Sequence, residues 1–208
     1  MSYYSDTQYK AKENIWFEKF YFARFFKGNS GPILDVGCAT GNFIATHPDF
    51  IEGIEVDDDS LRVCRERGFK VKKINVENEL ESLPDDYYTG VYVKQVIEHL
   101  HNPLYFFKHL QRMLQPGGKA VILTPNCPYA LTRFFWDDYT HERPFTKECL
   151  KRIALDAGFN KIKIYTDFRC FPGLGKLMRL FNLRPELISA LQNLFFVRGL
   201  SLIMELEK

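Results

Sequence analysis

A short run of small and acidic residues, Asp-Val-Gly-Cys-Ala-Thr-Gly at positions 35–41, carries the strongest chemical signal in the sequence. The apolar run before it predicts a buried strand that enters a turn. Gly37 permits a tight turn, and Gly41 lets the backbone pack closely or approach a ligand. Asp35 would place a carboxylate beside that ligand. We therefore predict a binding site at this turn.

A second carboxylate lies where such a site would need one. Glu55 follows Asp35 by 20 positions (55 − 35), at the end of the next predicted strand. In nucleotide-binding folds this is where a ribose diol is held. The turn lacks the G-x-G-x-x-G spacing that seats a pyrophosphate on a helix N-terminus. The acidic residue two positions before the turn suits a cationic amine better than a phosphate. A nicotinamide-dependent oxidoreductase is therefore a disfavoured alternative.

Apolar strands alternate with helical patterns along most of the chain. The predicted strands are 33–37, 50–56, 69–76, 90–96, 119–124, 161–166 and 200–206; the predicted helices are 8–27, 60–67, 103–114 and 147–157, with one more after the turn at Gly37. This alternation predicts βαβ units and a parallel sheet. Ligands of such sheets bind beyond the carboxyl ends of the strands. The loops after Gly37, Val56, Val76 and Val96 should therefore build the site.

Five segments of the chain occur in a specific order. They are Ile-Leu-Asp-Val-Gly-Cys-Ala-Thr-Gly-Asn-Phe (33–43), Gly-Ile-Glu-Val-Asp (53–57), Val-Ile-Glu-His-Leu-His-Asn-Pro (96–103), Leu-Gln-Pro-Gly-Gly-Lys (114–119) with Thr-Pro-Asn (124–126), and Thr-His-Glu-Arg-Pro-Phe-Thr (140–146) leading to Ala-Gly-Phe (157–159). In this combination the chain resembles the class I S-adenosylmethionine-dependent methyltransferases. It is similar to ubiquinone-pathway O-methyltransferases and to methyltransferases of surface-polysaccharide clusters.

The resemblance implies a Rossmann-like α/β fold with a seven-stranded, mostly parallel sheet flanked by helices. It implies S-adenosylmethionine as the cofactor and a small-molecule acceptor: a sugar, a quinone-like compound or a lipid-linked molecule, methylated on oxygen. A module that binds the cofactor without chemistry is a further alternative.

The resemblance also implies roles for matching positions. The first motif would hold the methionine part of the cofactor, the second-strand carboxylate both ribose hydroxyls, and the next residue the adenine. Asn75 and Val76, in the post-third-strand position, would adjoin the adenine, and Lys94 or Gln95 would lie beside the amino acid part. Ala39 replaces a frequent glycine, and Asn75 a commoner aspartate. The implied cofactor-binding residues are Asp35, Gly37, Cys38, Ala39, Gly41, Glu55, Val56, Asn75, Val76, Lys94 and Gln95.

Methylation of a hydroxyl is helped by a base that removes its proton. His99 follows the fourth predicted strand, and His101 comes two residues later. His141 lies in the long loop after the fifth strand, where the resembled family often places residues that face the substrate. We predict His141, and then His99, as the catalytic base.

Two other motifs are not assigned a function. The residues Asp137, Asp138, His141 and Glu142 could form a metal site, but acidic pairs are common in polar loops, so no metal is predicted. Asn-Cys-Pro-Tyr at 126–129 is similar to the Asn-Pro-Pro-Tyr of DNA methyltransferases. It follows the fifth strand instead of the fourth, so we expect no nucleic-acid partner.

The amino-acid composition limits the classes of protein to which the chain can belong. The chain of 208 residues is 46% hydrophobic and 26% charged, which suits one globular domain and excludes wholesale disorder. No apolar run reaches the roughly 18 residues of a spanning helix. The five cysteines show no paired C-x-x-C spacing, and the N-terminal residues lack the pattern of a secretory signal. These features favour the cytoplasm.

The expected domain has four parts. Residues 1–30 form an N-terminal helical cap, 31–170 the cofactor-binding core, 171–198 a helical insertion before the last strand, and 199–208 that strand. The insertion carries apolar residues at helical spacing bordered by basic ones. It could cover the acceptor pocket, form a dimer surface or contact a membrane peripherally. The protein could be a monomer or a homodimer.

Overall fold

The computed structural model describes residues 15–127, 133–167 and 201–208. Residues 1–14 of the predicted N-terminal cap and the whole predicted insertion at 171–198 lie outside these ranges. The division of the chain into a cap, a core and an insertion therefore stays a prediction. Within the described ranges, no helix has the length and apolar character needed to cross a membrane.

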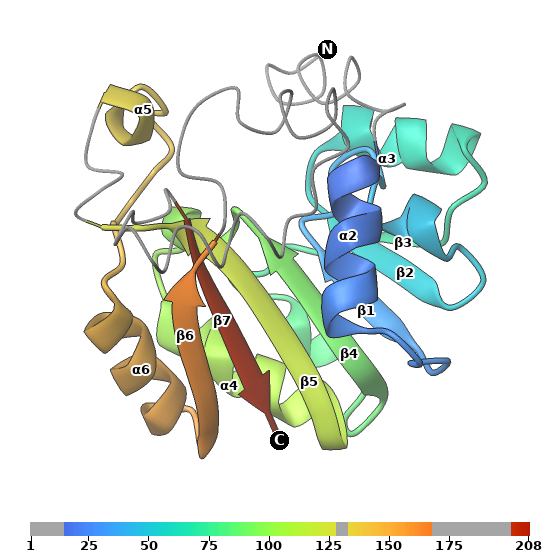
Figure 1. The fold of residues 1–208 in the computed structure, drawn as a ribbon. Helices are drawn as coiled ribbons and strands as arrows, with labels where there is room; N and C mark the ends of the chain where they lie inside the picture. Colours follow the sequence, from blue (N-terminus) through green and yellow to red (C-terminus); the bar gives the residue numbers. More distant parts are fainter. Residues whose placement is uncertain (1–14, 128–132, 168–200) are drawn as a thin grey trace, which may run out of the picture.

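A single seven-stranded sheet forms the centre of the structure (Figure 1). All neighbouring strands run parallel except β7, which is antiparallel to both of its neighbours. In spatial order the strands are β3 (Val71–Lys73), β2 (Ile51–Glu55), β1 (Ile33–Val36), β4 (Tyr88–Lys94), β5 (Leu114–Pro125), β7 (Ser201–Glu207) and β6 (Lys161–Thr166). The predicted α/β class and mostly parallel sheet are confirmed. The strand order places the carboxyl ends of β1, β2 and β4 next to one another.

Helices cover both faces of this sheet (Figure 1). They are α2 (Trp16–Phe25), α3 (Asp58–Glu66), α4 (Pro103–Met113), the short α5 (Arg133–Trp136) and α6 (Lys147–Asp156), with 3₁₀ turns η1 (Ile44–Thr46), η2 (Leu80–Ser82) and η3 (Ile97–His99). Successive strand residues face opposite sides. Val91 and Val93 therefore join the core beneath α4 and α6, whereas Tyr92 joins the core beneath α2.

Aromatic side chains fill the layer between α2 and the sheet. The Phe43 ring stacks on Tyr92 with centroids 3.9 Å apart, and Phe22 stacks on His47 at 3.7 Å. The Tyr21 hydroxyl donates to the buried carboxylate of Asp167 at 2.8 Å. The N-terminal helix is therefore packed against the sheet as part of its core, and this layer houses much of the chain's aromatic content.

Three predicted elements differ from the structure. No α-helix follows the Gly37 turn, where the described chain has turns and η1. Positive φ angles at Gly37, Ala39 and Gly41 prevent a continuous helix there. The strand predicted at 69–76 shortens to Val71–Lys73, because the chain turns at Asn75, whose side chain accepts from the Glu77 backbone N–H at 3.0 Å.

Strand β5 begins at Leu114, five residues earlier than predicted. The register shifts so that Tyr88 pairs with Leu114 and Gly90 with Lys119. The backbone of Gly117 and Gly118 then pairs with Lys208 at 2.9 and 3.1 Å, which keeps the Pro-Gly-Gly segment in the sheet.

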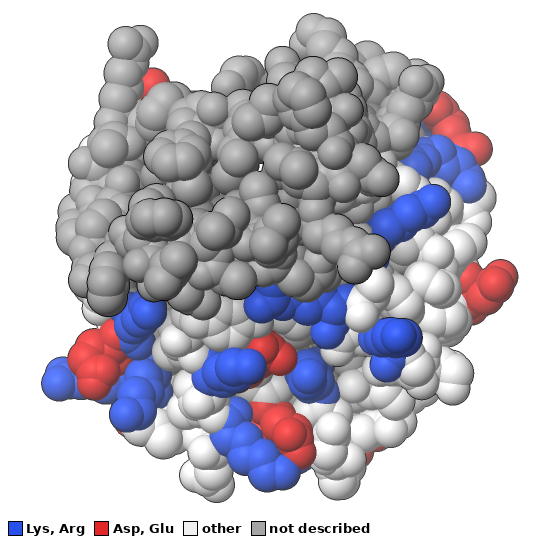
Figure 2. All heavy atoms as spheres, in the orientation of Figure 1, with Lys and Arg blue, Asp and Glu red and all other residues white. Residues whose placement is uncertain are grey.

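The edge formed by β6 and β7 shows cations next to anions. Lys161 pairs with Glu207 at 2.5 Å, and Lys163 lies 3.7 Å from Glu205. Figure 2 shows Lys and Arg among Asp and Glu on the described part of this face. These contacts fit a solvated, mixed-charge surface at this edge of the sheet.

Candidate functional site

The turn after β1 is closed by hydrogen bonds to the neighbouring strand. The amides of Gly37 and Cys38 donate to the carbonyl of Ile54 at 2.9 and 3.1 Å, and the Gly41 amide donates to Cys38 at 2.8 Å. Gly37 has a φ of +65°, and a methyl group there would lie 2.6 Å from Val96 Cγ2. Only glycine combines this backbone angle with so close a contact. The loops after β1 and β4 are therefore in direct contact.

Glu55 ties the turn after β1 to the end of β2. Its Oε2 accepts from the Ala39 amide at 2.9 Å, and its Oε1 accepts from the amides of Val56 and Asp57 at 2.7 and 3.1 Å. Each carboxylate oxygen accepts two hydrogen bonds, so Oε2 keeps capacity for another donor. The next side chain, Val56, is apolar yet 57% exposed. A fixed carboxylate thus stands beside an exposed apolar side chain.

Asp35 is buried at the end of β1. Burial raises the pKa of its carboxyl well above the ordinary value, the negative charge of Glu18 raises it further, and Lys94 lowers it. Lys94 Nζ donates to Glu18 Oε1 at 2.6 Å, and the Tyr92 hydroxyl donates to the other oxygen at 3.4 Å. Sequence reasoning missed Glu18. Its acidic side chain within an otherwise aromatic helix face was the available signal.

The residues predicted after β3 and β4 lie in turns. The backbone N–H of Asn75 donates to Glu79 Oε2 at 2.6 Å, and Val76 packs against the core beneath α4. Gln95 has a φ of +55°, and its backbone N–H donates to the carbonyl of Leu123 at 2.8 Å. Asn75, Val76 and Gln95 thus follow strands β3 and β4, whereas Lys94 is the last residue of β4.

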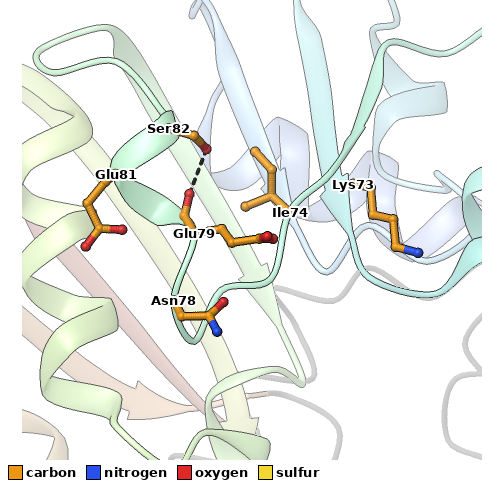
Figure 3. A pocket seen from close by; sticks show the side chains of 6 residues that line it. All are labelled: Lys73, Ile74, Asn78, Glu79, Glu81 and Ser82. Carbon is orange, nitrogen blue, oxygen red and sulfur yellow. Dashed lines mark hydrogen bonds between the residues drawn. The ribbon is translucent and has the colours of Figure 1, made fainter.

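A shallow hollow of about 410 Å³ lies next to the turn after β3 (Figure 3). It contains none of the predicted cofactor-binding residues. Five of the six residues that line it have polar or charged side chains, and Figure 3 shows Glu79 between Asn78 and Ile74. The lining residues are Lys73, Ile74, Asn78, Glu79, Glu81 and Ser82.

A second group of polar side chains joins the segment after β4 to the loop after β5. The backbone carbonyl of Glu98 accepts from the amides of Glu142 and Arg143 at 2.9 and 3.3 Å. This connection brings His99 and His141 together, with ring centroids 4.7 Å apart. His101 is not part of the group. Its side chain is 76% exposed and lies 3.3 Å from both Glu77 and Glu142.

The hydrogen bonds of both histidines define where their ring protons lie. His141 Nδ1 is 2.6 Å from the Phe135 carbonyl, so this nitrogen donates and Nε2 carries the lone pair of the neutral ring. The Thr140 hydroxyl donates to Asp138 at 2.6 Å and lies 2.9 Å from His99 Nδ1. Because the proton of the Thr140 hydroxyl is already donated to Asp138, the hydroxyl oxygen accepts a hydrogen bond from His99 Nδ1. Burial lowers the pKa of His99, as does the neighbouring His141.

Glu98 is fully buried beside the two histidines. Its Oε2 accepts from the Thr124 hydroxyl at 3.0 Å. Its Oε1 has no hydrogen-bond partner among the residues that the structure describes. Burial raises the pKa of Glu98 to about 8. Sequence reasoning identified Glu98 only as part of a motif. An acidic residue directly after the apolar Val96 and Ile97 was the signal that could have singled it out.

The sequence and the structure both match known methyltransferases. A family described as a methyltransferase domain matches residues 8–164. The ubiquinone biosynthesis O-methyltransferase of Dechloromonas aromatica is 31% identical over 103 residues, 45% of this chain and 44% of that protein. A probable S-adenosylmethionine-dependent methyltransferase of Mycolicibacterium smegmatis is 32% identical over 123 residues, 56% of this chain and 48% of that protein.

The fold has close solved neighbours. The crystal structure of an S-adenosylmethionine-dependent methyltransferase from Archaeoglobus fulgidus superposes with a TM-score of 0.76, covering 100% of both chains at 24% identity. The alignments with the two curated relatives span about half of their lengths.

Proposed function

Since the chain belongs to the methyltransferase-domain family of S-adenosylmethionine-dependent enzymes, we propose that it transfers a methyl group to an oxygen atom of a small-molecule acceptor. The acceptor classes are a sugar, a quinone-like compound or a lipid-linked molecule. The observation that carries this proposal is His141, whose Nδ1 donates to a backbone carbonyl and whose Nε2 is therefore a proton acceptor. The similarity to a ubiquinone biosynthesis O-methyltransferase supports the choice of oxygen.

The residues around the β1 turn fit the cofactor. A carboxylate held by three backbone amides, with one oxygen still able to accept, suits a ribose diol. The exposed Val56 side chain suits one face of the adenine, and the Asp35 carboxyl suits the cationic end of the methionine part. Membership of the methyltransferase family argues against the alternative of a nicotinamide-dependent oxidoreductase.

The reaction needs an acceptor oxygen aligned with the methyl group and a side chain that takes up one proton. When bound, S-adenosylmethionine supplies a methyl group on a positively charged sulfur. An acceptor oxygen forms the new bond to carbon while the carbon–sulfur bond breaks and its electron pair stays on sulfur. The hydroxyl proton passes to His141 Nε2, and the carbonyl of Phe135 stabilises the resulting imidazolium through Nδ1. The side chain of His141 is only 10% exposed, so competing water is limited.

The test is the variant His141→Ala, with His101→Ala as the matched control. A positioned general base contributes about 10²–10⁴-fold to rate. We expect turnover of His141→Ala to fall by at least about tenfold while the affinity for S-adenosylhomocysteine, measured by calorimetry, stays within about twofold. His101→Ala should keep wild-type turnover, because its exposed ring lies outside the group.

Acceptors would be screened with S-adenosylmethionine that carries a deuterated methyl group. Mass spectrometry of phenolic, sugar and amine acceptors should detect labelled O-methyl products. Labelled products confined to amines would refute oxygen as the target. Cofactor binding with no product from any acceptor would favour a binding module.

A further inference from the structure

We propose that Glu98, His99 and His141 form a binding site for a divalent transition-metal ion. Each residue offers one ligand atom, and these atoms lie within 4.8 Å of one another. The three come from two segments, η3 and the loop after β5, which the Glu98 carbonyl joins through the amides of Glu142 and Arg143. A backbone connection of this kind holds ligands from separate segments in one place.

The buried carboxylate provides an independent observation. Glu98 has no exposed surface, and its Oε1 lacks a hydrogen-bond partner among the described residues. A buried carboxylate oxygen without a hydrogen-bond partner is destabilising, and more so when the group is charged. A cation at this position would satisfy Oε1, while Thr124 holds Oε2 at 3.0 Å. The arrangement gives a reason for an acidic residue inside an otherwise apolar layer.

The contacts around the histidines are those that ligand histidines usually have. Ligand imidazoles almost always donate their other ring nitrogen to a carbonyl or carboxylate, which fixes the ring orientation. His141 Nδ1 meets the Phe135 carbonyl at 2.6 Å, and His99 Nδ1 meets Thr140, whose hydroxyl in turn donates to Asp138. Both rings are thus oriented through Nδ1, which leaves Nε2 as the ligating atom of each.

The donor set narrows the choice of ion. Two imidazoles and one carboxylate suit Zn²⁺, Co²⁺, Mn²⁺ or Fe²⁺, whereas Mg²⁺ and Ca²⁺ prefer oxygen ligands alone. Three protein ligands leave at least one position for water or substrate, as in catalytic metal sites. This inference revises the expectation from sequence that no metal is bound. The sequence pattern drew attention to Asp137 and Asp138, and the structure instead uses Asp138 to hold Thr140.

The inferred ion would act in the proposed methyl transfer, and this part rests on the proposed function. Val96, two residues before Glu98, contacts Gly37 of the turn after β1, so the ion site adjoins the loops that would hold the cofactor. A hydroxyl on the open position would lose its proton more readily, because the ion stabilises the alkoxide. The proton would pass to solvent water instead of His141 Nε2, and the oxygen would then form the carbon–oxygen bond as before.

The primary test is Co²⁺ binding, which is read from visible absorbance and needs no activity. Tag-free protein, first stripped with a chelator, would be titrated with Co²⁺. We expect saturation at one equivalent for wild type and for His101→Ala. The variants Glu98→Gln, His99→Ala and His141→Ala should each bind Co²⁺ at least about tenfold more weakly. Circular dichroism would verify folding. Thr140→Val is a milder variant that keeps all three ligands and removes only the hydroxyl that contacts His99 and Asp138.

Each outcome separates the ion site from the methyl transfer. Absence of saturable Co²⁺ binding, or equal affinity in wild type and the three ligand variants, would overturn the site. Activity that is undiminished by chelation yet lost in His141→Ala would overturn the role of the ion and leave His141 as the base. Specific Co²⁺ binding without methyl transfer to any acceptor would keep the ion site and refute the proposed function.

Discussion

The contact between Gly37 and Val96 allows a quantitative test of how the two loops are joined. In Gly37→Ala the residue would have to keep a φ of +65°, and its methyl group would lie 2.6 Å from Val96 Cγ2. The left-handed backbone angle costs a non-glycine residue roughly 1–2 kcal/mol. Relief of the overlap by shifting packed atoms costs about 1–3 kcal/mol more. The free energy of unfolding should therefore fall by about 2–5 kcal/mol.

Gly68→Ala separates these two costs. Gly68 also has a positive φ, +76°, but a methyl group there would meet no atom within 4 Å. This variant should lose only the backbone cost, about 1–2 kcal/mol. Both variants would be measured by urea unfolding of the protein without ligand.

A double-mutant cycle with Val96→Ala completes the test. The Val96 Cβ lies 3.9 Å from the position that the added methyl group would take. This is an ordinary contact, so removing Cγ2 should restore about 1–3 kcal/mol to Gly37→Ala. The reasoning would be refuted if Gly37→Ala destabilised the protein no more than Gly68→Ala, or if Val96→Ala produced no coupling.

Two further predictions concern the charges at the end of β1. Because burial raises the pKa of Asp35, the contribution of this group to stability is fully present below the unfolded pKa of about 3.9 and is lost as pH rises through the folded pKa. In urea unfolding without ligand, Asp35→Asn should therefore be more stable than wild type, by a margin that grows from pH 4.5 to pH 7.5. Its affinity for S-adenosylmethionine should fall by at least about tenfold. A stability difference that stays constant across this pH range would contradict the raised pKa of Asp35. Glu18→Gln should lower the free energy of unfolding by about 1 kcal/mol, because the partly buried pair with Lys94 is lost, and a cycle with Lys94→Met should show that the two effects are not additive.

The sheet was largely predictable from sequence, because its strands are short apolar runs between glycine and polar turns. Strand β6 has the predicted bounds, and β1, β2, β4 and β7 differ by one or two residues at their ends. The error after Gly37 arose because a strand–turn–helix pattern was assumed, whereas positive φ angles at Gly37, Ala39 and Gly41 favour consecutive turns.

The site was predictable only where its residues are close in sequence to a motif. Asp35, Glu55 and the Gly37 turn lie at strand ends and were found by spacing. The Glu18–Lys94 pair joins residues 76 positions apart, and its two members belong to different elements that no local pattern connects. The group of Glu98, His99 and His141 likewise forms through backbone contacts between two loops. Its histidines were predicted by residue type, but their association required the fold.

The antiparallel β7 has a consequence for the order in which the sheet assembles. Among the described strands, β6 pairs with β7, which lies between it and β5. Between the end of β6 and the start of its partner lie 34 residues (201 − 167), and strand β5, which ends at Pro125, waits still longer for the same partner. Closing such sequence-distant pairs is entropically slow. Insertion of residues 201–207 is therefore expected to be a late folding step, and until it occurs two unpaired backbone edges are available for intermolecular association.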